Sequence, residues 1–115
     1  MDSILTSIKK LLGITEEYTH FDPDIITHIN SAFFTLTQLG VGPSEGFSIK
    51  NSSATWDDFL SNANSKNLEA VKSYVYLKVK LLFDPPLTSS VTEAIKSQIS
   101  EYEWRLNVET DNSNT

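Results

Sequence analysis

Residues 21–40, which read FDPDIITHINSAFFTLTQLG, contain the most complete helix signal in the chain. Asp22 is predicted to be the N-cap, and Pro23 then occupies the first helical position, where its missing N–H removes no hydrogen bond. Gly40 predicts the end of the helix, because glycine readily adopts the left-handed conformation found beyond helix ends. Apolar residues recur every three or four positions, which predicts one buried face made of Ile25, Ile29, Ala32, Phe33, Leu36 and Leu39.

The segment before this helix predicts a shorter one over residues 2–12. Its isoleucines and leucines recur at helical spacing and form one apolar stripe. Asp2 or Ser3 is expected to cap the start, and Gly13 is expected to end the helix.

The segment that follows, residues 41–54, changes character to VGPSEGFSIKNSSA. Glycine and serine dominate it, and its apolar residues Phe47 and Ile49 alternate with polar ones. This composition predicts a loop with room for one short strand. Thr55 and Asp58 then have the spacing of a capping box, which predicts a short helical turn containing the residues TWDDFL.

A third long helix is predicted over residues 67–83, after the helix-breaking run SNANSKN. Pro85 and Pro86 end it, because proline cannot continue the backbone hydrogen-bond ladder and disfavours helix in the residue before it. Its apolar face is broad, which predicts the most buried helix of the protein. That face contains Leu68, Val71, Tyr74, Val75, Leu77, Leu81 and Leu82.

The last helix is predicted over residues 88–108. Thr88 is one candidate cap, and Ser90 with Glu93 makes a second, as a capping box. The remaining residues, 109–115, contain no apolar side chain and are expected to form a flexible tail. The apolar seam of the helix contains Val91, Ile95, Ile99, Tyr102 and Leu106.

Together these signals predict an all-α fold: a small bundle of about four helices plus one short turn, interrupted by an irregular or short-strand segment near residues 41–54. The 115 residues suffice for one modest core, and we expect a single domain over residues 1–108. No apolar run approaches the roughly 20 residues that cross a bilayer. The chain has no cysteine, which excludes disulfides and thiolate chemistry.

Candidate catalytic and metal chemistry is sparse. The one metal-like group is His20, Asp22, Asp24 and His28, but helix capping and first-turn charge already explain both aspartates. No nucleophile motif and no glycine-rich phosphate loop followed by lysine is present. We therefore expect no enzyme activity, no metal and no cofactor.

Nucleic-acid binding would have to use Lys66, Lys72, Lys78 and Lys80 beside Tyr74. The net charge of −6 argues against this use, because affinity for phosphate backbones comes from clustered cations. Solvated lysines beside core tyrosines are the favoured interpretation.

The order of these parts resembles the head–tail connector proteins of tailed double-stranded DNA bacteriophages, also called adaptor or head-completion proteins. The resemblance covers nearly the whole chain, from Met1 to about Val108, and no single motif decides it. The stretches that carry it are ILTSIKKLLGI, FDPDIITHINSAFFTLTQLGVGP, GFSIKNSSATWDDF, LEAVKSYVYLKVKLLFDPP and a final helix ending in YEWRL.

This resemblance implies a structural virion protein at the neck between head and tail, made in the host cytoplasm. It implies a homo-oligomeric ring, usually a dodecamer, that docks beneath the portal protein, meets a tail or neck completion protein, and extends the channel through which DNA passes without specific binding. We expect the segment 41–54 to contact neighbouring subunits or the next ring, and the C-terminal region to contact the portal. The candidate interface residues are Phe47, Ile49, Lys50, Trp104, Arg105 and Val108.

Two other classes remain open at this point. One is a small helical regulator that acts by binding another protein, and the other is a helical nucleic-acid-binding protein. Presence in the virus particle separates the connector from the regulator, and salt-dependent retention on DNA identifies the third class.

Overall fold

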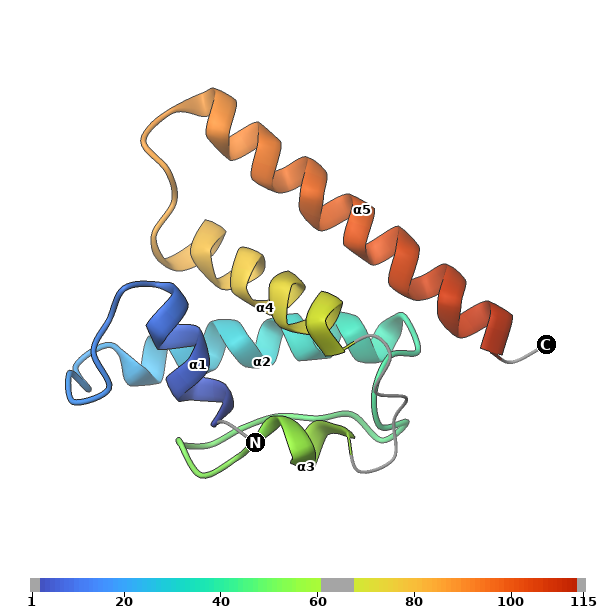
Figure 1. The fold of residues 1–115 in the computed structure, drawn as a ribbon, viewed down its shortest axis with the longest axis horizontal. Coiled ribbons are helices and arrows are strands. Elements are labelled where there is room, and N and C mark those ends of the chain that lie inside the picture. Colours follow the sequence, from blue (N-terminus) through green and yellow to red (C-terminus); the bar gives the residue numbers. More distant parts are fainter. Residues whose placement is uncertain (1–2, 61–67, 114–115) are drawn as a thin grey trace.

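The computed structural model describes residues 3–60 and 68–113, and within them the chain forms five helices (Figure 1). This confirms the predicted all-α class. Across those described residues the β contacts amount to a single bridge between Ser3 and Thr55, so the segment 41–54 is irregular and contains no strand. The helices are α1 (Ile4–Leu11), α2 (Asp22–Gln38), α3 (Trp56–Leu60), α4 (Leu68–Phe83) and α5 (Ser89–Ser113).

Two helices begin with the caps that the sequence predicts. Ser3 Oγ accepts a hydrogen bond from the backbone N–H of Thr6 at 3.2 Å, which caps α1. At α3 the capping box is reciprocal, because the N–H of Asp58 donates to Thr55 Oγ1 at 3.3 Å and the N–H of Thr55 donates to Asp58 Oδ2 at 2.9 Å. These contacts satisfy N–H groups that have no partner inside the helix.

Helix ends also follow local chemistry. Gly13 and Gly40 lie just beyond α1 and α2 with φ values of 82° and 83°, a conformation that glycine adopts without steric cost. Helix α4 ends at Phe83, directly before Asp84 and the double proline.

Two predicted helix ends are wrong. Asp22 is not the N-cap of α2: Phe21 holds that position without a side-chain hydrogen bond, and Asp22 lies in the first turn, where its carboxylate faces Lys9. At α5 the first of the two candidate caps is confirmed, because Thr88 Oγ1 accepts from the N–H of Val91 at 3.4 Å, while the second candidate, Ser90, lies inside the helix.

The second wrong helix end is the C-terminal end of α5. The helix continues to Ser113 instead of ending at residue 108, so residues 109–113 of the predicted flexible tail have a helical backbone. Residues 114–115 and the predicted break at 61–67 lie outside the described residues.

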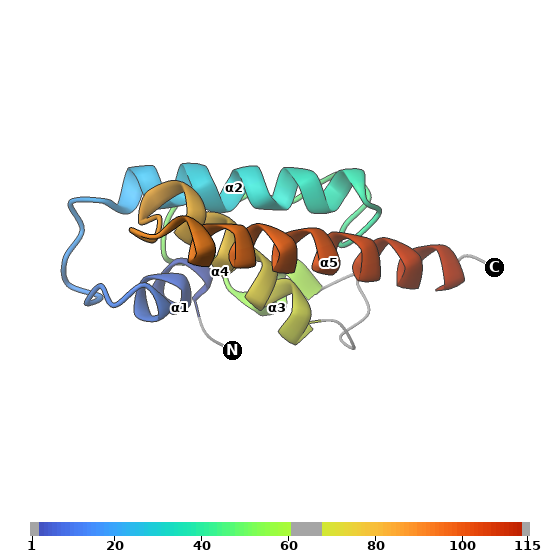
Figure 2. The same ribbon diagram turned by 90° about the horizontal axis from the view of Figure 1, so that it is seen from above.

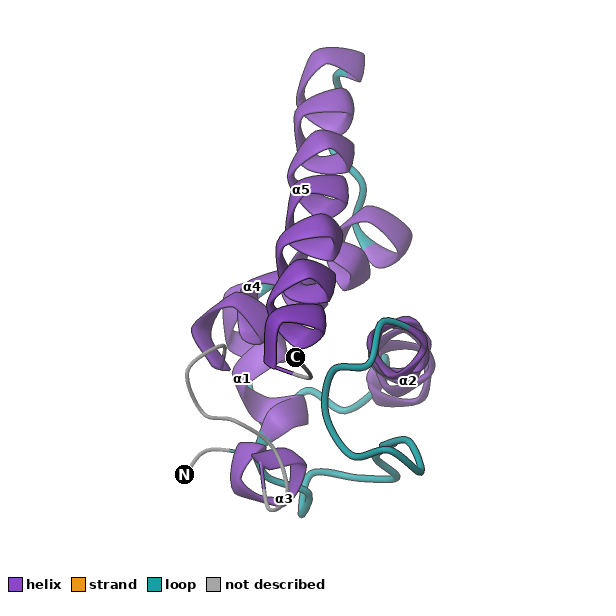
Figure 3. Ribbon diagram, turned by 90° about the vertical axis from the view of Figure 1, so that its right-hand side faces the viewer, coloured by secondary structure: helices purple, strands orange, loops and turns teal. Residues whose placement is uncertain are grey.

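The helices are arranged around α4, which packs against both α2 and α5 (Figure 1). Helix α1 also packs against α2 and α4. Figure 2 shows α2 along one edge of the molecule, and Figure 3 shows α5 extending well beyond the other helices. The result is a flattened body of 43 × 35 × 19 Å. No helix among residues 3–60 and 68–113 combines the length and the apolar character needed to cross a membrane.

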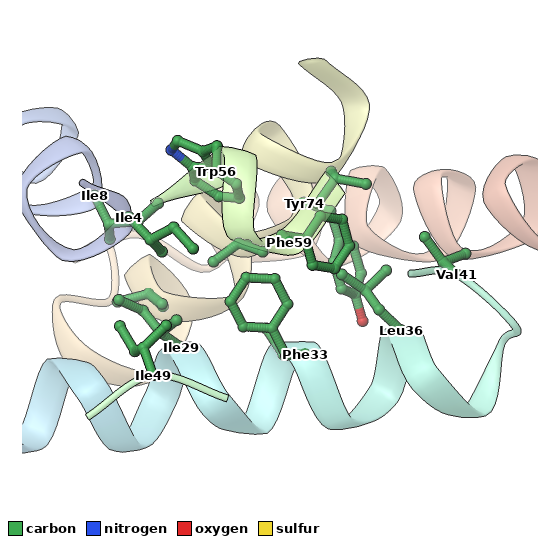
Figure 4. Close-up of a cluster of buried hydrophobic side chains, with 14 of the residues drawn as sticks. Ile4, Ile8, Ile29, Phe33, Leu36, Val41, Ile49, Trp56, Phe59 and Tyr74 are labelled. Carbon is green, nitrogen blue, oxygen red and sulfur yellow. The ribbon is translucent and has the colours of Figure 1, made fainter. Parts of the chain in front are cut away.

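Aromatic side chains form the centre of the core (Figure 4). The ring of Phe33 lies 5.1 Å from that of Phe59 and 5.0 Å from that of Phe47, measured between centroids. Trp56 is fully buried next to them, and its indole N–H donates to Ser7 Oγ at 2.9 Å. These contacts join α1, α2, α3 and the segment 41–54, and aromatic pairs at such distances add stability beyond the area they bury.

Three apolar residues assigned to apolar faces are exposed, and one of them is Leu11, the last residue of α1. Leu82 lies beyond Val79, the last buried residue of α4, and Val91 lies before Ile95, the first buried residue of α5. Both therefore sit where the two helices extend past the core toward their connection. The apolar periodicity correctly predicts which side of each helix is buried. It does not show how far along that side the opposing helix extends.

Phe33 and Phe34 provide an internal test of this core, because adjacent helical residues point in different directions. We expect Phe33→Ala to lower the free energy of unfolding by about 3–5 kcal/mol through lost burial and cavity formation. Phe34 is 65% exposed, so Phe34→Ala should change the free energy of unfolding by less than about 0.5 kcal/mol. Denaturant titration followed by far-ultraviolet circular dichroism measures both, and equal effects would contradict the assigned core.

Candidate assembly surfaces

The segment 41–54 is held against α2 by the side chain of Asn30. The N–H of Ile49 donates to Asn30 Oδ1 at 2.7 Å, and Asn30 Nδ2 donates to the carbonyl oxygen of Ile49 at 2.9 Å. One amide side chain thus satisfies both backbone groups that a neighbouring strand would otherwise satisfy. This explains why an alternating sequence is extended here without belonging to a sheet.

The two apolar residues of this segment face inward. Ile49 is 3% exposed, and Phe47 packs edge-on against Phe33 and Phe59. Lys50, by contrast, is exposed. The structure therefore separates three residues that the sequence analysis grouped as one candidate interface, and their role in an interface stays a prediction.

The absence of a side chain at Gly42 lets this segment pack closely against the core. Its φ is +89°, and a Cβ atom built there would lie 2.6 Å from the ring of Phe59. Because aromatic atoms cannot be approached that closely, any side chain at Gly42 would displace Phe59 and loosen the cluster it shares with Phe47.

The second candidate surface is the outer face of α5. Trp104 is 67% exposed, while Ile99 and Leu106 bury the opposite face of the helix. Arg105 Nη2 lies 2.7 Å from Glu101 Oε1, and these two residues help to line a surface hollow of about 150 Å³. The outer face of α5 thus offers an aromatic side chain beside a charged pair, whereas Val108 is half-buried.

A buried hydrogen bond fixes how α5 sits on the bundle. Tyr74 Oη donates to Glu103 Oε2 at 2.7 Å, joining α4 to α5. Burial raises the pKa of Tyr74 well above its ordinary value, the hydrogen bond and negative charge of Glu103 raise it further, and Thr35 acts weakly in the opposite direction. The phenol therefore remains a protonated donor at any physiological pH.

Lys9 is an anchor that the sequence analysis missed. It is 2% exposed, and its Nζ donates to the carbonyl oxygens of Glu16 and Tyr18 at 3.0 and 2.8 Å. The same nitrogen lies 2.9 Å from Asp22 Oδ1, as an ion pair and not a directed hydrogen bond. One ammonium thus holds the loop between α1 and α2 in place. Its only sequence signal is its position on the apolar side of α1, directly after Ile8.

The residues that the sequence offered as a metal-binding group do not form one site. Asp22 pairs with Lys9, and the ring of His20 packs edge-on against that of Phe21 with centroids 5.0 Å apart. Across the described ranges, no group of three or more histidine, aspartate or glutamate side chains is placed to hold a metal ion.

The lysines of α4 do not form a basic stripe. Lys72 lies over the ring of Trp56 and 3.8 Å from Glu69, Lys78 lies over the ring of Tyr74, and Lys80 pairs with Asp84 at 3.2 Å. Lys66 lies outside the described residues. The geometry thus defines a small helical protein in which, among the described residues, neither a metal-binding group nor a basic stripe is formed.

Comparison with known protein families agrees with this class. A family model described as phage connector protein matches residues 4–113, which include all five helices. The chain therefore belongs to the phage connector protein family. Membership implies a structural role at the head–tail junction, with binding to portal or tail components, in a family of structural proteins and not enzymes. No curated protein and no solved structure matches the chain.

The anchoring role of Lys9 predicts an asymmetry between two adjacent lysines. We expect Lys9→Met to lower the free energy of unfolding by about 2–4 kcal/mol, because two carbonyl groups and a carboxylate lose their partner. Lys10 is exposed, and Lys10→Met should change the free energy of unfolding by less than about 0.5 kcal/mol. Thermal and denaturant unfolding of the two variants measures the difference, and a neutral Lys9→Met would contradict the anchor.

The contact between α4 and α5 predicts a second effect on stability. Tyr74→Phe should cost about 1–3 kcal/mol, because Glu103 keeps its place but loses its donor. Tyr18→Phe, at an exposed ring, is the matched control. Hydrogen exchange of the α5 amides gives the second readout: faster exchange confined to α5 is expected in Tyr74→Phe, and unchanged exchange would contradict the contact.

Proposed function

We propose that this chain is a subunit of a homo-oligomeric ring at the phage neck, docked beneath the portal protein and followed by a tail or neck completion protein. The observation that carries the proposal is the family match over residues 4–113, which spans the entire bundle. The ring continues the channel through which DNA leaves the head and completes the head after packaging.

The shape of the subunit supports this arrangement. A body 19 Å thick in its smallest dimension fits side-by-side packing around a ring, and the C-terminal end of α5 extends past the other helices (Figure 1), where it is available to a neighbouring layer. We assign the outer face of α5 around Trp104 and Arg105, with the adjacent Val108, to contact with the portal. Large aromatic and arginine side chains are enriched among the residues that dominate binding energy.

The segment 41–54 is assigned to contacts with a neighbouring subunit or the next ring through its exposed polar residues, which include the charged Glu45 and Lys50. Phe47 and Ile49 act indirectly by holding that surface in place, since their side chains belong to the core. Deleting the segment would therefore disturb folding, and Lys50→Glu is the cleaner test of its role in ring formation.

The charge of the chain supports a channel that DNA crosses freely. The net charge is −6, and an acidic surface repels the phosphate backbone. The α4 lysines are each engaged with an aromatic ring or a carboxylate, which leaves little cationic surface for retention of DNA.

Antibody labelling of this chain in purified particles tests the location. Label at the neck, seen by electron microscopy, is the expected result. Absence of the chain from particles, by mass spectrometry as well as by labelling, would overturn the proposal and leave a regulatory protein-binding role.

The portal contact predicts a specific defect in a variant. Trp104→Ser should weaken binding to the purified portal at least about 30-fold, equivalent to about 2 kcal/mol. Val91→Ser, at an exposed apolar residue near the other end of the same helix, should leave binding unchanged. Circular dichroism should show both variants folded, and equal binding by Trp104→Ser and the unmodified chain would contradict this contact.

A further inference from the structure

The outward face of α2 has no charged residue along most of its length. Residues 25–44 contain no aspartate, glutamate, lysine or arginine, although these residues make up 21% of the chain. Many of these positions belong to the core, where charged residues are not expected, so the informative observation is that every exposed position of α2 after Asp24 carries an uncharged side chain.

The exposed residues of this run form one stripe. Thr27, Ser31, Phe34 and Gln38 are all exposed and follow one another at spacings of four, three and four, which places them on one side of a helix. The core residues Ile29 and Leu36 lie on the opposite side. Figure 2 shows that α2 forms one edge of the molecule, with no other helix lying beyond it.

Phe34, in the middle of the stripe, is 65% exposed. A single exposed phenylalanine is common on protein surfaces and alone indicates nothing. Here it coincides with a stripe that lacks charge, and this combination of an aromatic residue with depleted charge is the compositional mark of the centre of a protein–protein interface. The outer face of α5 differs, because Trp104 there is flanked by Glu101 and Arg105.

Charge also indicates the occupant. Each copy of this chain carries −6, so two copies repel one another wherever their acidic surfaces meet. The stripe on α2 is where a second acidic copy can approach without placing carboxylates against carboxylates or removing a charge from water. In a ring of identical subunits, every junction is made by the same two surfaces. One face that a like-charged neighbour can approach therefore serves every junction of the ring.

We propose that the stripe of Thr27, Ser31, Phe34 and Gln38 on α2 is the face against which the neighbouring copy of this chain packs in the assembled neck. This inference rests on the proposed ring and adds to it the surface that holds adjacent subunits together. Phe34 is the central anchor, and its burial between copies removes an apolar side chain from water without any change in the fold of the subunit.

Replacing Phe34 with the photo-reactive aromatic p-benzoylphenylalanine tests the occupant in assembled particles. Irradiation should give an adduct of two copies of this chain, identified by mass spectrometry. The control is the same replacement at Tyr18, an exposed aromatic in the loop that contains Glu16 and Glu17, which should give no such adduct.

Other outcomes of this experiment overturn specific statements. An adduct between position 34 and the portal or another virion protein would overturn the second copy as occupant. Incorporation of the chain into particles without any adduct at position 34 would overturn the surface. Absence of the chain from particles would overturn the proposed function itself, and the inference with it, which distinguishes that failure from the other two.

A charge substitution provides the second test. Phe34→Asp should lower the amount of chain in particles at least tenfold, because it places a carboxylate in the centre of the contact. Leu87→Asp, which adds the same charge at a fully exposed apolar residue on the α4–α5 connection, should leave incorporation unchanged. Both variants should unfold at the same temperature as the unmodified chain, and equal incorporation of the two would overturn the proposal.

Discussion

The packing of Phe33 against Phe47, Phe59 and Trp56 is the contact on which the rest of this protein depends. It brings together α2, the irregular segment 41–54 and the short helix α3, and Trp56 extends the connection to α1 through Ser7. A helix of five residues and a loop rich in serine have little stability alone. Their positions are fixed because the aromatic side chains they carry are buried together in one cluster.

The surfaces available for assembly are a consequence of this packing. Because the segment 41–54 directs Phe47 and Ile49 inward, it offers mainly polar groups to a partner. The two most exposed aromatic side chains lie instead on helices, at Phe34 on α2 and Trp104 on α5. The two faces differ in charge, which fits the proposal that one surface binds a second copy of the chain and the other binds a different protein.

Buried polar contacts give these surfaces a fixed geometry. Lys9 holds the loop between α1 and α2, Asn30 holds the segment 41–54, and Tyr74 with Glu103 sets the position of α5 on α4. Each contact satisfies groups that would be costly to bury alone, so each specifies one arrangement among several with similar apolar packing. Such a defined shape is what the proposed ring would require of each subunit at its contacts with its neighbours.

The sequence by itself determined the features that depend on neighbouring residues. The helix class, the capping box of Thr55 and Asp58, the terminating glycines and the buried face of α2 follow from spacing and local backbone chemistry, and all are present. The tertiary structure alone decided which groups lie opposite one another. Ile49 forms hydrogen bonds with the side chain of Asn30, 19 positions away. Asp22 pairs with Lys9 instead of capping α2, and Leu82 and Val91 lie beyond the ends of the core. These outcomes depend on contacts between distant segments, and no local pattern contains that information.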